Sequence, residues 1–111
     1  MGHARPAASI DAVKGSIAHF ESGGSYTAHN PQPGQTASGK YQFTDATWKG
    51  FARDLYPGKS DAELLAMKAD PATQERVMDH ALASYSRGLR AAGAPVTPGN
   101  LYLLHFLGPK G

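Results

Sequence analysis

The chain has 111 residues, of which 41% are hydrophobic and 18% are charged, and this composition is typical of one globular domain rather than of a disordered or membrane-inserted chain. Its 11 Lys and Arg against 9 Asp and Glu give a small, scattered positive excess, which does not favour nucleic acid as a partner. The lack of cysteine excludes disulfides and thiolate metal sites. Residues 1–8 contain no apolar run, so they are no signal peptide; we expect them to be disordered or added by cloning, and residues 9–111 to form a single domain.

The first predicted helix runs from a cap at Ser9 to Glu21. Its apolar face is expected to carry Ile10, Val13, Ile17 and Phe20. Residues 23–36 are rich in Gly, Pro, Asn, Ser and Thr, which predicts a long loop. We expect Lys40 to Phe43 to form a short extended piece.

The second helix is predicted to start at Thr44 or Asp45 and to end before Pro57. Its apolar residues follow helical spacing at Trp48, Phe51, Ala52 and Leu55. This spacing favours Trp48 as a core residue rather than a platform for a sugar. A capping box at residues 60–63 then opens a short third helix that runs through Lys68.

Two cap-proline pairs predict the last two helices. Asp70-Pro71 starts a fourth helix that runs to about Ala92, and Thr97-Pro98 precedes a fifth helix from Leu101 to Leu107. The inward face of the fourth helix is expected to carry Val77, Met78, Ala81, Leu82, Tyr85 and Leu89. The sequence therefore predicts a mainly α fold of about five helices. Its abrupt end after an apolar helix suggests a domain truncated at the C-terminus within a longer parent chain.

Glu21 is unusual because it is an acid at the predicted C-terminal end of a helix. The negative end of the helix dipole and the apolar neighbour Phe20 both disfavour the ionised carboxylate and raise its pKa. A carboxyl group that is kept protonated can act as a general acid. The alternative is a solvated acid that bears a small electrostatic penalty.

Metal and cofactor sites are not predicted. None of the histidines forms a His-Glu-x-x-His pattern, and no glycine-rich phosphate loop follows a strand. The five histidines are His3, His19, His29, His80 and His105. We therefore expect no metal and no cofactor.

Two segments carry a resemblance to a known family. Glu21-Ser22-Gly23-Gly24 is followed by Ser38-Gly39-Lys40-Tyr41-Gln42-Phe43 and then by Trp48. This order resembles the soluble lytic transglycosylases, which have a lysozyme-like helical fold, Glu-Ser at the end of a helix and a later Gly-x-x-Gln segment. The resemblance covers residues 10–108.

The resemblance implies roles for several residues. Glu21 would be the catalytic acid and then the base in a substrate-assisted reaction that closes a 1,6-anhydromuramic ring. Ser38 and Gln42 would line the cleft near the scissile bond, and Tyr41 would occupy the family's apolar cleft position, so that all three would bind the substrate. Independently of the family, Tyr26 lies in the predicted loop and is either a sugar-stacking residue or a simple surface aromatic.

The third motif of the family, Ala-Tyr-Asn-x-Gly, is altered here. Its counterpart is Leu104-His105-Phe106-Leu107-Gly108, which keeps the glycine but replaces the tyrosine and asparagine. His105 is the residue that could supply a polar contact in their place.

Three functions follow as alternatives. The first is a lytic transglycosylase that breaks the MurNAc-(β1,4)-GlcNAc bond of peptidoglycan. The second is a hydrolytic muramidase, such as an endolysin, for which Asp45 and Asp54 are the nearest second carboxylates; the simpler roles are a helix cap for Asp45 and a solvated position for Asp54. The third is a non-catalytic module that binds the cell wall. All three predict peptidoglycan glycan strands as the partner, a monomer without membrane insertion, and a periplasmic, secreted or phage virion-associated location.

Overall fold

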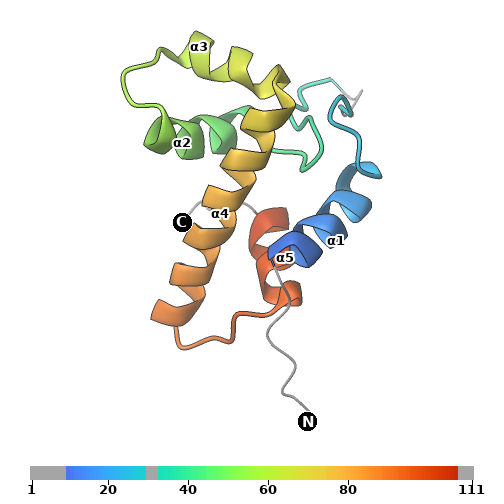
Figure 1. The fold of residues 1–111 in the computed structure, drawn as a ribbon, viewed down its shortest axis with the longest axis vertical. Coiled ribbons are helices and arrows are strands. Elements are labelled where there is room, and N and C mark those ends of the chain that lie inside the picture. The colour runs from blue at the N-terminus through green and yellow to red at the C-terminus, as the bar shows by residue number, and fades with distance from the viewer. Residues whose placement is uncertain (1–9, 30–32, 108–111) are drawn as a thin grey trace.

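The fold is mainly α, as the sequence predicts. The computed structural model describes residues 10–29 and 33–107, so Ser9, the N-terminal segment 1–8 and Gly108 lie outside the described residues. Within these ranges the chain forms five α-helices and one short 3-10 helix (Figure 1). They are α1 (Ile10–Ser22), α2 (Asp45–Leu55), α3 (Asp61–Ala66), the 3-10 helix η1 (Met67–Ala69), α4 (Pro71–Ala91) and α5 (Pro98–Leu107).

Helix α4 is the central element of the fold. In Figure 1 it runs down the middle of the molecule, with α2 and α3 on one side and α1 and α5 on the other. It contacts α1, α2 and α5 directly, whereas α3 packs on α2. The loop between α1 and α2 crosses from one side of α4 to the other, so residues of both sides can meet along it.

The predicted starts of α2, α3 and α4 are confirmed by their caps, whereas α5 begins at Pro98, before the predicted Leu101. Thr44, rather than Asp45, is the N-cap of α2, and its side chain accepts a hydrogen bond from the Thr47 backbone. Both bonds of the predicted capping box of α3 are present. Asp70 caps α4 immediately before Pro71. These local signals fix where these three helices begin.

The core lies between α4 and the other helices. All six residues predicted to face inward from α4 are buried. Trp48 is fully buried, and its indole N–H donates a hydrogen bond of 2.7 Å to the Leu64 carbonyl oxygen. The prediction that Trp48 belongs to the core is therefore confirmed.

Two residues predicted to face inward are exposed. Phe20 is 73% exposed and Leu55, in the last turn of α2, is 37% exposed. Successive residues of an α-helix are rotated by about 100° around its axis. The buried residues of α1, which lie between Val13 and Ala18, therefore form an arc around the helix, and the centre of this arc points in the same direction as Glu21. Phe20 lies at the edge of that arc. The rotation of α1 therefore turns Phe20 outward and Glu21 inward.

The segment predicted to be extended is mostly a turn. Ser38 pairs with His29 and with Phe43 in isolated antiparallel bridges, and residues 39–42 form a turn between them. The described part of the α1–α2 loop contains no strand. Its shape depends on contacts with the helices.

Candidate functional site

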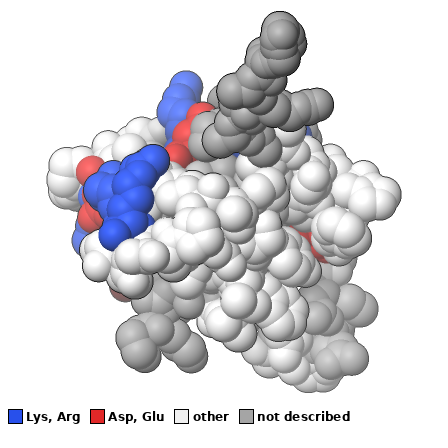
Figure 2. Space-filling model, turned by 90° about the horizontal axis from the view of Figure 1, so that it is seen from below, with Lys and Arg blue, Asp and Glu red and all other residues white. Residues whose placement is uncertain are grey.

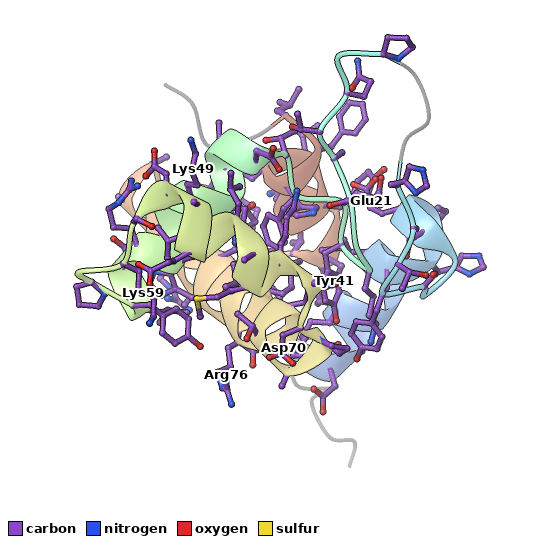
Figure 3. All side chains as sticks on the ribbon, turned by 90° about the horizontal axis from the view of Figure 1, so that it is seen from above. Glu21, Tyr41, Lys49, Lys59, Asp70 and Arg76 are labelled. Atoms are coloured by element: carbon purple, nitrogen blue, oxygen red, sulfur yellow. The ribbon has the colours of Figure 1, made fainter. Side chains whose placement is uncertain are left out.

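A cleft of about 760 Å³ opens beside the C-terminal end of α1. Its walls come from α1, the α1–α2 loop, α2 and α5, and they include Glu21, Gln42, Phe43, Asp54, His105 and Phe106. Viewed from above, the Glu21 side chain lies at the end of α1, beside the loop (Figure 3).

Glu21 is half-buried in this cleft. Burial raises the pKa of its carboxyl group above the ordinary value of 4.5. Phe20 does not contribute this burial as the sequence predicts, because its own side chain is largely exposed to solvent. Among the described residues, no hydrogen-bond donor or cation pairs with the Glu21 carboxyl group, so this group can engage a ligand.

Ser22 fixes the end of α1 against the turn at residues 39–42. Its hydroxyl donates to the Lys40 carbonyl oxygen at 2.6 Å and accepts from the Gly24 backbone N–H at 3.0 Å. Gly23 has φ +67°, the left-handed conformation that commonly ends a helix. The serine therefore ties the chain that follows Glu21 to the turn, a role that sequence reasoning missed although Ser22 belongs to the recognised motif.

Gly39 and Gln74 form the support of this turn. The Gln74 side chain is buried; its Oε1 accepts from the Lys40 backbone N–H at 2.9 Å, and its Nε2 donates to the Tyr26 and Lys68 carbonyl oxygens. Gly39 has φ +85°, and a Cβ atom there would lie 2.6 Å from Gln74 Oε1. Only glycine fits this close approach.

Gln42 presents one polar atom to the cleft. Its Nε2 donates to the carbonyl oxygens of Gly39 at 2.8 Å and of Ala28 at 3.1 Å, which uses both amide hydrogens. Its Oε1 accepts no hydrogen bond among the described residues. Gln42 also has φ +54°, a conformation that residues other than glycine rarely adopt. The strained backbone and the two donated bonds hold the side chain in one orientation.

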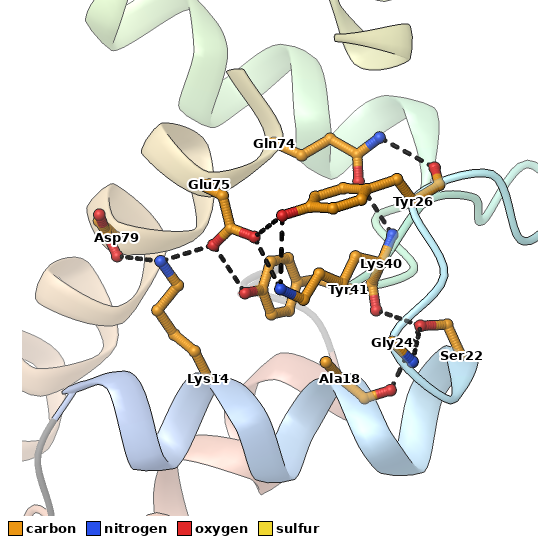
Figure 4. Close-up of polar contacts among 10 residues, drawn as sticks. All are labelled: Lys14, Ala18, Ser22, Gly24, Tyr26, Lys40, Tyr41, Gln74, Glu75 and Asp79. Atoms are coloured by element: carbon orange, nitrogen blue, oxygen red, sulfur yellow. Dashed lines mark hydrogen bonds and ion pairs between the residues drawn. The ribbon is translucent and has the colours of Figure 1, made fainter. Parts of the chain in front are cut away.

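A polar cluster around Glu75 holds the other side of the loop (Figure 4). Its carboxylate pairs with Lys14 at 2.7 Å and Lys40 at 2.9 Å, and accepts from the hydroxyls of Tyr26 at 2.6 Å and Tyr41 at 2.8 Å. Burial alone raises the pKa of Glu75, but these four donors outweigh it and lower the pKa to about 2. The cluster joins α1, the loop and α4.

The cleft brings together three of the six residues predicted for the site: Glu21, Gln42 and His105. Tyr41 is 1% exposed, and its hydroxyl, like that of Tyr26, is bound to Glu75. Ser38 contributes its backbone to the bridge with Phe43. Tyr26, Ser38 and Tyr41 are not among the residues that line the cleft, and direct substrate contacts by them stay predictions.

His105 is buried and lines the cleft. Its Nε2 lies 2.5 Å from the Tyr41 carbonyl oxygen, which can only accept, so Nε2 carries the hydrogen. Burial lowers the pKa of His105, although the bond to Tyr41 opposes this effect, and the neutral ring then accepts at Nδ1 from the Tyr85 hydroxyl at 3.1 Å. The ring also packs edge-on against Phe43. His105 thus couples α5 to the Gly39–Gln42 turn.

Of the two other acids considered, only Asp54 lines the cleft. Its Oδ2 lies 3.0 Å from His80 Nε2. Asp45 instead pairs with Lys68 at 2.9 Å and is not among the residues that line the cleft. Asp54 is thus a second carboxylate that lines the cleft, and its side chain is 63% exposed, in agreement with the predicted solvated position.

Basic residues do not gather at the cleft. No lysine or arginine is among the described residues that line it, and in Figure 3 Lys59 and Arg76 are seen well away from Glu21. On the face shown in Figure 2, Lys and Arg gather toward one side, and most of the remaining described surface is uncharged. Between residues 10 and 107, with 30–32 left aside, no group of three or more potential metal ligands is found, and no described helix is long and apolar enough to cross a membrane.

Part of the chain is similar to two curated proteins, each named "Probable transglycosylase SceD". The protein from Staphylococcus haemolyticus (strain JCSC1435) is 53% identical over 47 residues, which are 42% of this chain and 19% of that protein. The protein from Staphylococcus epidermidis (strain ATCC 35984) is 45% identical over 60 residues, which are 54% of this chain and 24% of that protein. The matches thus span less than a quarter of either relative. No family model matches the chain, and no solved structure matches it.

Proposed function

We propose that this domain is a lytic transglycosylase that breaks the MurNAc-(β1,4)-GlcNAc bond of peptidoglycan. The observation that carries the proposal is Glu21, a half-buried carboxyl group with a raised pKa that no described cation or donor pairs, facing an open cleft. The partial similarity to proteins named as probable transglycosylases supports the same reaction class. A wall substrate would place the protein in the periplasm, outside the cell or in a virion.

The reaction uses Glu21 twice. The protonated carboxyl donates its proton to the glycosidic oxygen, the bond from that oxygen to C1 of MurNAc breaks, and the 2-acetamido oxygen of the same sugar stabilises the cation at C1. The Glu21 carboxylate then takes the proton of the 6-hydroxyl, and O6 bonds to C1 to close the 1,6-anhydro ring. No water is consumed, and Glu21 ends protonated for the next turnover.

Other groups of the site position the sugar. Gln42 Oε1 is held at the cleft with its amide hydrogens already engaged, so it is ready to accept from a sugar hydroxyl or acetamido N–H. Tyr41 and His105 act as positioning residues, because they fix the turn that carries Gln42. The two changes in the third family motif would then alter substrate contacts without removing the acid.

Hydrolysis is the second candidate, and Asp54 favours it. A carboxylate that lines the same cleft as Glu21 and bonds to His80 can act as a base that activates water. The product would be a reducing MurNAc end instead of an anhydro end.

Mass spectrometry of digested purified peptidoglycan tests these functions. We expect wild type to release anhydromuropeptides, Glu21→Gln to lose about a thousandfold in rate, and Asp54→Asn and the exposed α1 control Asp11→Asn to keep activity. Reducing products that disappear in Asp54→Asn would establish the hydrolase instead. Wall binding without any soluble product from wild type would refute both enzymatic functions and leave a binding module.

A further inference from the structure

Three aromatic rings form a continuous exposed row beside the cleft. Phe20 of α1 is 73% exposed, Phe106 of α5 is 65% exposed, and Tyr102 of α5 lies half-exposed between them. The ring centroids of Phe20 and Tyr102 are 5.9 Å apart, and those of Tyr102 and Phe106 are 6.1 Å apart with an interplanar angle of only 22°. We call these three residues the aromatic ridge.

The aromatic ridge is continuous with the cleft. Phe106 belongs both to the ridge and to the cleft wall, and Phe20 directly precedes Glu21 in α1. A ligand that leaves the cleft past Phe106 therefore meets the ring of Tyr102 and then that of Phe20.

The ridge rings contact one another and the His19 ring, but most of the Phe20 and Phe106 side chains remains exposed to solvent. Among the described residues, the cation–π contacts fall on Tyr26 and Tyr41, and none falls on the ridge. Leaving such large apolar surfaces in water opposes folding, because burial of apolar surface stabilises the folded state. Flat aromatic faces of this kind suit the C–H faces of pyranose rings, and the Tyr102 hydroxyl and the nearby His19 ring add polar groups at their edges.

The volume of the cleft also indicates that a long glycan would extend beyond it. Pockets of roughly 300–1,000 Å³ enclose one small ligand, and this cleft has about 760 Å³. A glycan strand bound at Glu21 must therefore extend over the neighbouring surface, and the aromatic ridge adjoins one end of the cleft.

We propose that the aromatic ridge is an additional saccharide-binding surface that holds glycan units beyond those in the cleft. This inference rests on the proposed function. It commits to the glycan, rather than to a second copy of the chain or another segment of a longer parent, because the ridge is aromatic and continuous with the cleft.

Binding of glycan oligomers of two lengths tests the ridge. In the Glu21→Gln background, we would titrate a tetrasaccharide and an octasaccharide of alternating GlcNAc and MurNAc by calorimetry. We expect Phe20→Ala and Tyr102→Ala to weaken octasaccharide binding about tenfold and to leave tetrasaccharide binding unchanged. Tyr102→Phe, which keeps the ring, should restore the affinity.

Leu103→Ala is the matched control, because Leu103 is 51% exposed on the same helix but makes no ring contact in the ridge. It should change neither affinity. The ridge proposal alone would be overturned if the Glu21→Gln protein bound the tetrasaccharide and the octasaccharide equally tightly. It would also be overturned if Leu103→Ala weakened octasaccharide binding as much as the ridge variants do. A dimer in sedimentation that Phe20→Ala dissociates would overturn it in favour of an interface between copies. If neither oligomer binds, the proposed function fails and the ridge proposal fails with it.

Discussion

Replacing Glu75 with glutamine is expected to loosen the α1–α2 loop and destabilise the whole fold. The four donors around Glu75 lower its pKa from the ordinary 4.5 to about 2. Each factor of ten in proton affinity corresponds to about 1.4 kcal/mol, so the difference amounts to about 3 kcal/mol of stabilisation by the charged form. The side chain is 27% exposed, and water screens part of this energy. We therefore expect a loss of about 2 kcal/mol in unfolding free energy at pH 7.

The sign of the pH dependence follows from the lowered pKa. Stabilisation by the Glu75 carboxylate is complete above pH 4.5, and it is lost as the pH falls toward 2, because the folded state must then bind a proton that it disfavours. The stability difference between wild type and Glu75→Gln should thus shrink from pH 7 to pH 2. Urea unfolding measures it directly, since Trp48 is the only tryptophan and is fully buried.

Asp79→Asn serves as the control for Glu75→Gln. Asp79 also pairs with Lys14, at 2.8 Å, but its side chain is 56% exposed and it reaches no other member of the cluster. Its removal should cost less than about 1 kcal/mol. The reasoning would be refuted by a difference between wild type and Glu75→Gln that stays constant with pH, or by equal effects of the two variants.

Three further predictions concern the residues around the cleft. Gly39→Ala should lower the unfolding free energy by about 2–3 kcal/mol, because both the positive φ and the approach to Gln74 oppose a Cβ atom, whereas Gly34→Ala, with a positive φ in open space, should lower it by about 1 kcal/mol; equal losses in urea unfolding would contradict this. Ser22→Ala should lower the unfolding free energy by about 1 kcal/mol, and it should lower kcat even where the variant is fully folded. Urea unfolding measures the first effect, and initial rates measure the second. The raised pKa of Glu21 predicts that kcat/KM falls as the pH rises through a value above 4.5, because the acid must begin protonated; a pH profile with its limb at or below 4.5 would exclude Glu21 as the acid.

The helices could be predicted from sequence because their signals are local. The caps at Thr44, Ser60 and Asp70 lie within three residues of the groups they bind, so the sequence contains both partners of each bond. Phe20 was placed incorrectly because helical spacing defines a stripe but not the point where the neighbouring helix contacts it. That point is set by the packing of α1 on α4.

The site could be predicted only where a motif marks it. Glu21 and Gln42 belong to recognisable segments, and both line the cleft. No motif marks the contacts that hold them: the bonds from Ser22 to the Lys40 carbonyl and from Tyr26 to Glu75 join residues 18 and 49 positions apart. From its sequence context, Glu75 is an ordinary charge in the second turn of a helix. Such pairings depend on tertiary packing and leave no local pattern.

The anchoring of the loop on Gln74 has a consequence for hydrogen exchange and for the time at which the site forms. The Lys40 amide is bonded to a buried side chain of α4, and the Gly39 amide to the Ala28 carbonyl at 2.7 Å. These amides should exchange with solvent at the slow rate of the α4 core rather than at the fast rate of a surface loop. A chain that has not yet folded α4 carries Glu21 without an anchored loop beside it, because Gln74 of α4 holds the Lys40 amide. The proposed lytic activity would then arise only in the fully folded domain, and a partly folded chain would not cleave peptidoglycan.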